Sequence, residues 1–132
     1  MKTLANCTPR EFLTQTIKIK NAVSKWLTDT DIMAIRKRTP VIADGMSKAE
    51  KDEAYTKQGL SNLSAMYDEI AGRHPDETLE LLALLCFTEP DKVDEHPMTE
   101  YLTAISDMLG SEAVTGFFTS LMKLARTGIL KL

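Results

Sequence analysis

The chain has 132 residues, of which 43% are hydrophobic and 27% charged. This length is typical of one domain that buries a core without disulfides or metal ions, and the composition excludes a largely disordered protein. A formal net charge of −3 and a sequence pI near 5.4 argue against a protein built mainly to bind nucleic acid.

The first predicted helix begins at Thr8, which is followed by Pro9 and by Glu11 in capping-box positions. Its apolar stripe comprises Phe12, Thr16, Ile19, Val23 and Trp26, widened by Leu13, Ile17 and Leu27. A short helix is expected over 32–38, since Pro40 disfavours helical geometry at Thr39. Residues 39–46 then form a loop.

Ser47 and Glu50 form a second capping box, from which a long helix should run to about Ala71. Its second half carries Leu60, Leu63, Met66, Tyr67 and Ile70 at core spacing. The next helix begins at Pro75, and its segment from Leu79 to Phe87 is apolar almost all round. That segment should lie at the centre of the fold, with Cys86 as a small buried side chain.

Two further helices follow. One begins at Pro97 and ends at Gly110, and the last begins after Ser111 and ends at Gly128. Their expected core stripes are Tyr101, Leu102, Ile105, Met108 and Leu109, then Val114, Phe117, Phe118, Leu121, Leu124 and Ala125. The sequence thus predicts an all-α protein, an irregular bundle of about five long helices plus one or two short ones.

The predicted domain spans residues 1–132, with a basic N-terminal segment over residues 1–45 and an acidic helical body over residues 47–127 before a short C-terminal tail. Residues 1–45 hold eight Lys and Arg against four acids, whereas residues 76–107 hold nine acids against Lys92 alone. We expect the two segments to complement each other within the fold, although such a chain can also self-associate head to tail.

The sequence contains few residues in patterns suited to catalysis or metal binding. His74 and His96 could join Asp91, Asp94 and Glu95 in a metal or hydrolytic site, but the two histidines do not have the i, i+4 placement of a helical metal site. Both histidines precede a proline at an expected helix start, where a polar residue is favoured anyway. No phosphate-binding glycine loop and no nucleophile elbow occurs in the sequence. We therefore expect a protein that is not an enzyme and holds no cofactor or metal.

The sequence contains one basic cluster and an unusually large number of methionines, seven in all. Met66, Met108 and Met122 lie on predicted core stripes, whereas other methionines suit an adaptable protein-binding surface. The candidate partner-binding residues are Met33, Arg36, Lys37, Arg38, Met46 and Met98. The cluster Arg36–Arg38 also leaves open an alternative, a small helical regulator that binds nucleic acid through the basic N-terminal third.

The N-terminal residues turn polar directly after Ala5, unlike a secretory signal, and no apolar run approaches the ~20 residues of a spanning helix. The expected compartment is the cytoplasm, with no membrane association.

Three blocks carry a family resemblance across nearly the whole chain. They are Thr8–Leu13 leading to Asp31–Arg36, then Glu77–Phe87, and finally Glu112–Leu121. Together they resemble small helical proteins of tailed phages and prophages of Firmicutes, which we group with the tail assembly chaperones of long-tailed, siphovirus-type phages.

The resemblance implies a protein of the bacterial host cytoplasm that binds the tape-measure protein during tail morphogenesis. Such a chaperone keeps the tape measure soluble, helps to recruit tail-tube subunits and is absent from the mature virion. The resemblance supplies no catalytic residues.

Overall fold

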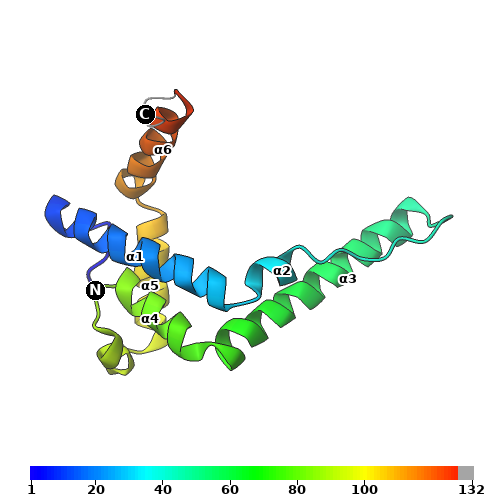
Figure 1. Ribbon diagram of the computed structural model, residues 1–132, viewed down its shortest axis with the longest axis horizontal. Coiled ribbons are helices and arrows are strands. Elements are labelled where there is room, and N and C mark those ends of the chain that lie inside the picture. Colours follow the sequence, from blue (N-terminus) through cyan, green and yellow to red (C-terminus); the bar gives the residue numbers. More distant parts are fainter. Residues whose placement is uncertain (128–132) are drawn as a thin grey trace. The chain divides into compact units, whose positions relative to one another are not determined.

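The computed structural model describes residues 1–127, and over this range the chain is all-α, with no β-strand (Figure 1). The elements in chain order are α1 (Pro9–Asp29), α2 (Ile32–Arg36), α3 (Lys48–Tyr67), the π-helical turn η1 (Asp68–Arg73), α4 (Pro75–Leu85), the 3₁₀ segment η2 (Pro90–Glu95), α5 (Met98–Leu109) and α6 (Glu112–Arg126). The predicted all-α class, with five long helices and short segments between them, is confirmed. The predicted helix end at Gly128 and the tail beyond it lie outside the described residues.

Local capping explains where several helices begin. At α1 the Glu11 amide donates to the Thr8 hydroxyl at 3.2 Å, and the Thr8 amide donates to the Glu11 carboxylate at 3.0 Å. Ser47 and Glu50 make the same reciprocal pair before α3. Both predicted capping boxes are therefore present.

Two helix ends differ from the sequence-based expectation. The short helix α2 ends at Arg36 rather than Arg38. The long helix changes at Tyr67 into the π-helical turn η1, which ends at Arg73. The cause of this end is local, because Pro75 disfavours helical geometry at His74, whose φ is −129° and ψ 50°.

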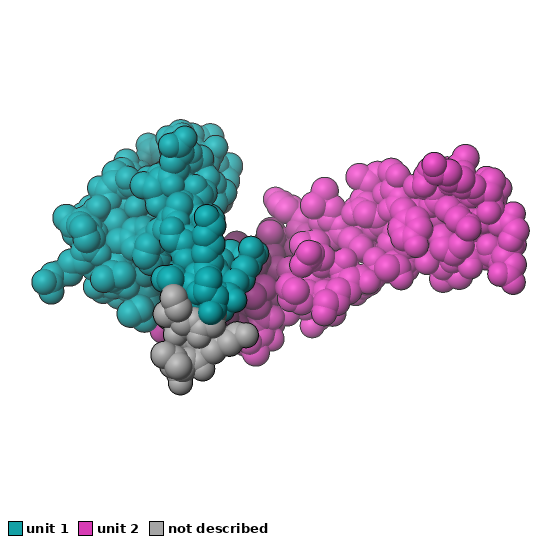
Figure 2. All heavy atoms as spheres, turned by 90° about the horizontal axis from the view of Figure 1, so that it is seen from above, with its two compact units in different colours: residues 1–20, 80–132 teal, residues 21–79 magenta. Residues whose placement is uncertain are grey.

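The chain divides into two compact units (Figure 2). Unit 1 comprises Met1–Lys20 and Glu80–Leu132, and unit 2 comprises Asn21–Leu79. The first turns of α1 and the last turns of α4 therefore belong to unit 1. The prediction of a single folding domain stays a prediction.

Unit 1 has a small core around the N-terminal segment and helices α1, α5 and α6. Leu4, Met108 and Val114 are buried, with Cys7, Phe12, Ile19, Leu85 and Phe87 packed against them. Beside this core the Gln15 amide donates to the Leu84 carbonyl at 2.6 Å. Cys86 is buried as predicted, and its desolvation raises the pKa of the thiol.

Unit 2 buries Ile32 and Ile35 of α2. The Trp26 indole donates to the Thr78 hydroxyl at 3.1 Å, and the Asn62 amide of α3 donates to the Arg38 carbonyl at 2.9 Å. These side-chain bonds tie α1 to α4, and α3 to the segment that follows α2.

The pKa of the Glu11 carboxyl group is strongly lowered. The hydrogen bond from Lys2, followed by those with Thr8, lowers its pKa from 4.5 to about 2. A carboxyl whose pKa is depressed on folding stabilises the fold above its unfolded pKa, and this contribution is lost as the pH falls from about 4.5 through about 2.

In an NMR titration we expect Glu11 to titrate near pH 2, and Lys2→Ala to raise its midpoint towards 4.5. A wild-type midpoint at the ordinary value, unmoved by Lys2→Ala, would show that this pair does not form in solution.

Candidate functional site

The apolar stripe of α6, predicted to be core, is largely exposed. Val114 in the first turn is buried at 5% exposure, whereas Phe117, Phe118, Leu121 and Leu124 are each 40–42% exposed. Past the first turns, α6 extends away from α5 and from the start of α1 (Figure 1). The spacing correctly predicted an amphipathic helix, but a helical period does not report whether a neighbouring helix covers the stripe.

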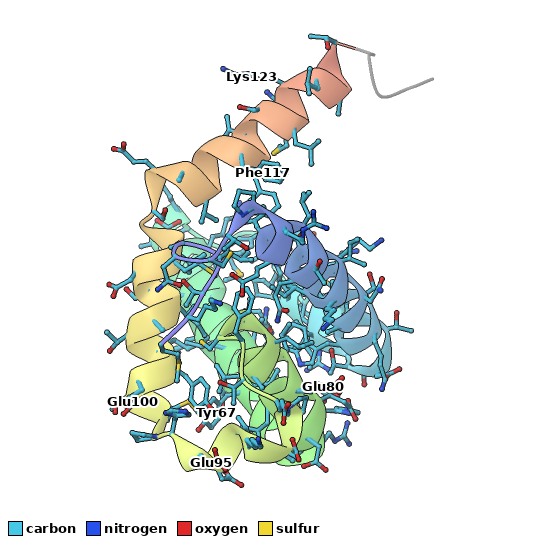
Figure 3. The ribbon with its side chains drawn as sticks, turned by 90° about the vertical axis from the view of Figure 1, so that its left-hand side faces the viewer. Tyr67, Glu80, Glu95, Glu100, Phe117 and Lys123 are labelled. Atoms are coloured by element: carbon cyan, nitrogen blue, oxygen red, sulfur yellow. The ribbon has the colours of Figure 1, made fainter. Side chains whose placement is uncertain are left out.

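Three phenylalanines hold the base of α6 against α1. The Phe117 ring meets the Phe12 ring edge-on, with centroids 4.9 Å apart, and meets Phe118 similarly at 5.3 Å. Edge-to-face contacts at these distances are favourable aromatic geometry. Figure 3 shows Phe117 at this junction and Lys123 farther along α6. These contacts hold the start of α6 against α1, whereas Leu121 and Leu124 of its later turns are exposed among the described residues.

The first turns of α1 add two more exposed apolar side chains beside this junction. Leu13 and Ile17 are 58% and 59% exposed. An apolar groove joins the two helices, and its lining includes Leu4, Cys7, Pro9, Leu13, Val114 and Phe117. We call the set Leu13, Ile17, Phe117, Phe118, Leu121 and Leu124 the α1/α6 face. Exposed apolar patches of roughly 300–600 Å² commonly mark interaction sites, and six half-exposed large side chains are of that order.

Positive charge borders this face on its α1 side. Arg10 precedes Leu13 by three residues and Lys20 follows Ile17 by three, which are spacings that place side chains on one side of a helix. On α6, Lys123 and Arg126 lie in the last turn on the polar side of the helix, away from the stripe. Within residues 1–127 none of these four cations forms an ion pair.

The face has few acids to offset these cations. On α1, Glu11 is already bound by Lys2, and on α6 the acid is Glu112 in the first turn. The α1/α6 face is therefore an apolar surface with a basic rim along α1, formed by Arg10 and Lys20.

The partner-binding residues predicted from the sequence fall into two groups. Met33, Arg36, Lys37, Arg38 and Met46 belong to unit 2, whereas Met98 starts α5 in unit 1. Met33 and Met98 are exposed. Met46 is only half-buried, and its sulfur accepts a hydrogen bond from the Ala43 amide. The exposed side chains of the α1/α6 face were not among these candidates.

In unit 2 the basic cluster lies close to acids. Arg38 lines a groove together with Asp68, Glu69 and Arg73. Among residues 1–127 no ion pair joins the basic segment 1–45 to the acidic part of the chain, so the expected charge complementarity between them stays a prediction.

His74 lies directly before α4, His96 lies two residues before α5, and both contact carboxylates. The His74 Nδ1 atom lies 2.8 Å from Glu77, and its Nε2 atom lies 3.3 Å from the buried Glu69. The His96 Nδ1 atom lies 2.8 Å from Glu100 on α5. Within the described range of the chain, no group of three or more His, Cys, Asp or Glu side chains is placed to hold a metal ion.

Among the helices of residues 1–127, none combines the length and the apolar character that crossing a membrane requires. Comparison of the chain with protein-family models, with curated proteins and with solved structures gave no match.

Proposed function

We propose that this chain is a non-enzymatic tail assembly chaperone of a tailed phage or prophage. It would bind the tape-measure protein in the host cytoplasm during tail morphogenesis, assist the recruitment of tail-tube subunits and be left out of the mature virion. The α1/α6 face is the observation that carries the binding aspect of this proposal, and the sequence resemblance supplies the identity of the partner.

The physical support is the fit between this face and a helical partner. A helix-in-groove interaction needs apolar side chains at helical spacing beside an apolar groove. Phe117, Leu121 and Leu124 provide that spacing on α6, and the groove beside Leu13 adjoins it. Aromatic side chains that are already partly ordered lose little entropy on binding, so Phe117 and Phe118 are suited to be energetic anchors.

The nucleic-acid alternative gains no support from the structure. Its basis is the cluster Arg36–Arg38, and Arg38 shares its groove with Asp68 and Glu69. Carboxylates beside a cation repel phosphate, so they weaken the attraction between that cation and a nucleic-acid backbone.

The test is co-expression of the chain with the tape-measure protein encoded by the same phage or prophage. We expect the tape measure to move into the soluble fraction and to co-purify with the tagged chain. An unrelated aggregating helical protein, expressed in the same way, is the control and should stay insoluble. A tape measure that still aggregates and does not co-purify would refute the proposal.

A further inference from the structure

Resting on the proposed function, we infer that the occupant of the α1/α6 face is an amphipathic helix of a partner protein whose apolar stripe is flanked by Asp and Glu side chains. The inference names the chemistry of the partner segment and the place where it binds. Two independent properties of the face lead to it, namely its uncovered apolar stripe and the sign of the charge around it.

The apolar stripe lacks a partner within the described chain. On α6 the exposed residues Phe117, Phe118, Leu121 and Leu124 recur at the i, i+1, i+4, i+7 positions of one helical side. Within residues 1–127, α6 packs only by its first two turns, and a helix of this length held in that way is marginal in water because isolated short helices are only weakly stable. A partner helix laid along α6 would cover the stripe, and one large apolar side chain could enter the groove beside Leu13.

The positive charge beside the face favours a partner helix whose apolar stripe is flanked by acidic side chains. Arg10 and Lys20, on the same side of α1 as Leu13 and Ile17, are exposed and form no ion pair among the described residues. Acidic flanks would pair with these cations and accelerate association, whereas lysine flanks would be repelled.

Charge also argues against a second copy bound through the same face. A two-fold contact buries the same surface of both copies, so it would gather Arg10 and Lys20 of each copy in one interface without acids to pair with them. A second copy could instead present α5, where Met98, Leu102 and Leu109 are exposed beside the acidic segment η2. A second copy bound in this way is the competing occupant, which the experiment must distinguish from a partner helix.

The experiment uses two synthetic helical peptides with the same leucine stripe, one flanked by glutamates and the other by lysines. Each carries a fluorophore and is titrated with the full chain while anisotropy is recorded at low and high salt. We expect the glutamate peptide to bind at least about tenfold more tightly at low salt, and the difference to shrink as salt screens the charges.

Charge reversal at the rim provides the matched comparison. The double variant Arg10→Glu and Lys20→Glu should lose or invert the preference between the peptides. Lys51→Glu, on the exposed surface of α3, should leave the preference unchanged. Circular dichroism of both variants checks that the helices are retained.

Equal binding of the two peptides, or binding of neither, would overturn the inference. So would a concentration-dependent dimer in sedimentation that Leu121→Glu dissociates, because the face would then be occupied by a second copy. If the double variant still solubilises the tape measure, the proposed function stands and the charge-based inference is lost. If the peptides discriminate but the tape measure is not bound, the inference stands and the proposed function is lost.

Discussion

Replacing Tyr101 with alanine is expected to lower the free energy of unfolding by about 3–5 kcal/mol, the range for large aromatic side chains removed from a core. Tyr101 is 1% exposed, the most deeply enclosed aromatic side chain of unit 1. Its hydroxyl donates to the Val93 carbonyl at 2.8 Å, so the alanine variant loses both the ring packing and this buried hydrogen bond. The loss is a large fraction of the stability of an average domain.

Chemical denaturation followed by circular dichroism measures this effect. Tyr101→Phe keeps the ring and removes only the hydrogen bond, so it should cost about 1 kcal/mol. If alanine and phenylalanine at this position gave the same small loss, the ring would not belong to a packed core.

Glu69→Ala is expected to cost about 2–3 kcal/mol, because charged hydrogen bonds and buried polar groups are expensive to leave unsatisfied. The Glu69 side chain is 5% exposed in unit 2. It accepts the Asp31 amide at 3.2 Å and lies within 3.5 Å of Arg73 and 3.3 Å of His74. Its removal takes away the acceptor that joins the start of α2 to the π-helical turn η1.

An exposed carboxylate supplies the control for this second variant. Glu53 on α3 pairs with Lys57 at the surface, where such ion pairs contribute only about 0.3–0.5 kcal/mol. Urea denaturation should therefore separate Glu69→Ala from Glu53→Ala by more than about 1 kcal/mol. Equal effects would mean that the Glu69 network does not stabilise unit 2.

The features predicted best from the sequence are those set by neighbouring residues. Ser47 and Glu50 determine where α3 begins, and Pro75 determines where the preceding helix must end. Capping and proline geometry act over a few residues, so they can be inferred without tertiary structure. The π-helical form of η1 had no such local signal.

Burial was predicted less well, because helical period alone does not identify the covering element. Tyr101 and Leu102 were assigned to one core stripe, yet Tyr101 is buried and Leu102 is exposed. Among the methionines assigned to core stripes, Met108 is buried but Met122 is 56% exposed. The same stripe pattern serves contact within the chain and contact with a partner.

The long helix α3 shows the physical reason. Leu60, Leu63 and Tyr67 were predicted to be core but are 64–66% exposed. They lie on the side of α3 away from Asn62, whose side chain bonds to the segment after α2, and Glu69 of η1 contacts the start of α2. The predicted core stripe is therefore wrong for these three residues, because α2 packs against another side of the helix.

The candidate binding residues illustrate the same limit. Met33 and Met98 were chosen because methionines outside a stripe suggest exposure, and both are exposed. The stripe pattern predicts that Phe117 and Leu121 are buried, but both are exposed and lie in the α1/α6 face.

The most direct test of the α1/α6 face repeats the tape-measure co-expression with two α6 variants. Leu121→Glu places a charge on the apolar stripe, and Thr119→Glu places the same charge on an exposed position of the polar side. We predict that Leu121→Glu abolishes co-purification and returns the tape measure to the pellet, while Thr119→Glu behaves as the wild type. Co-purification that survives Leu121→Glu unchanged would contradict the assignment of this face as the binding surface.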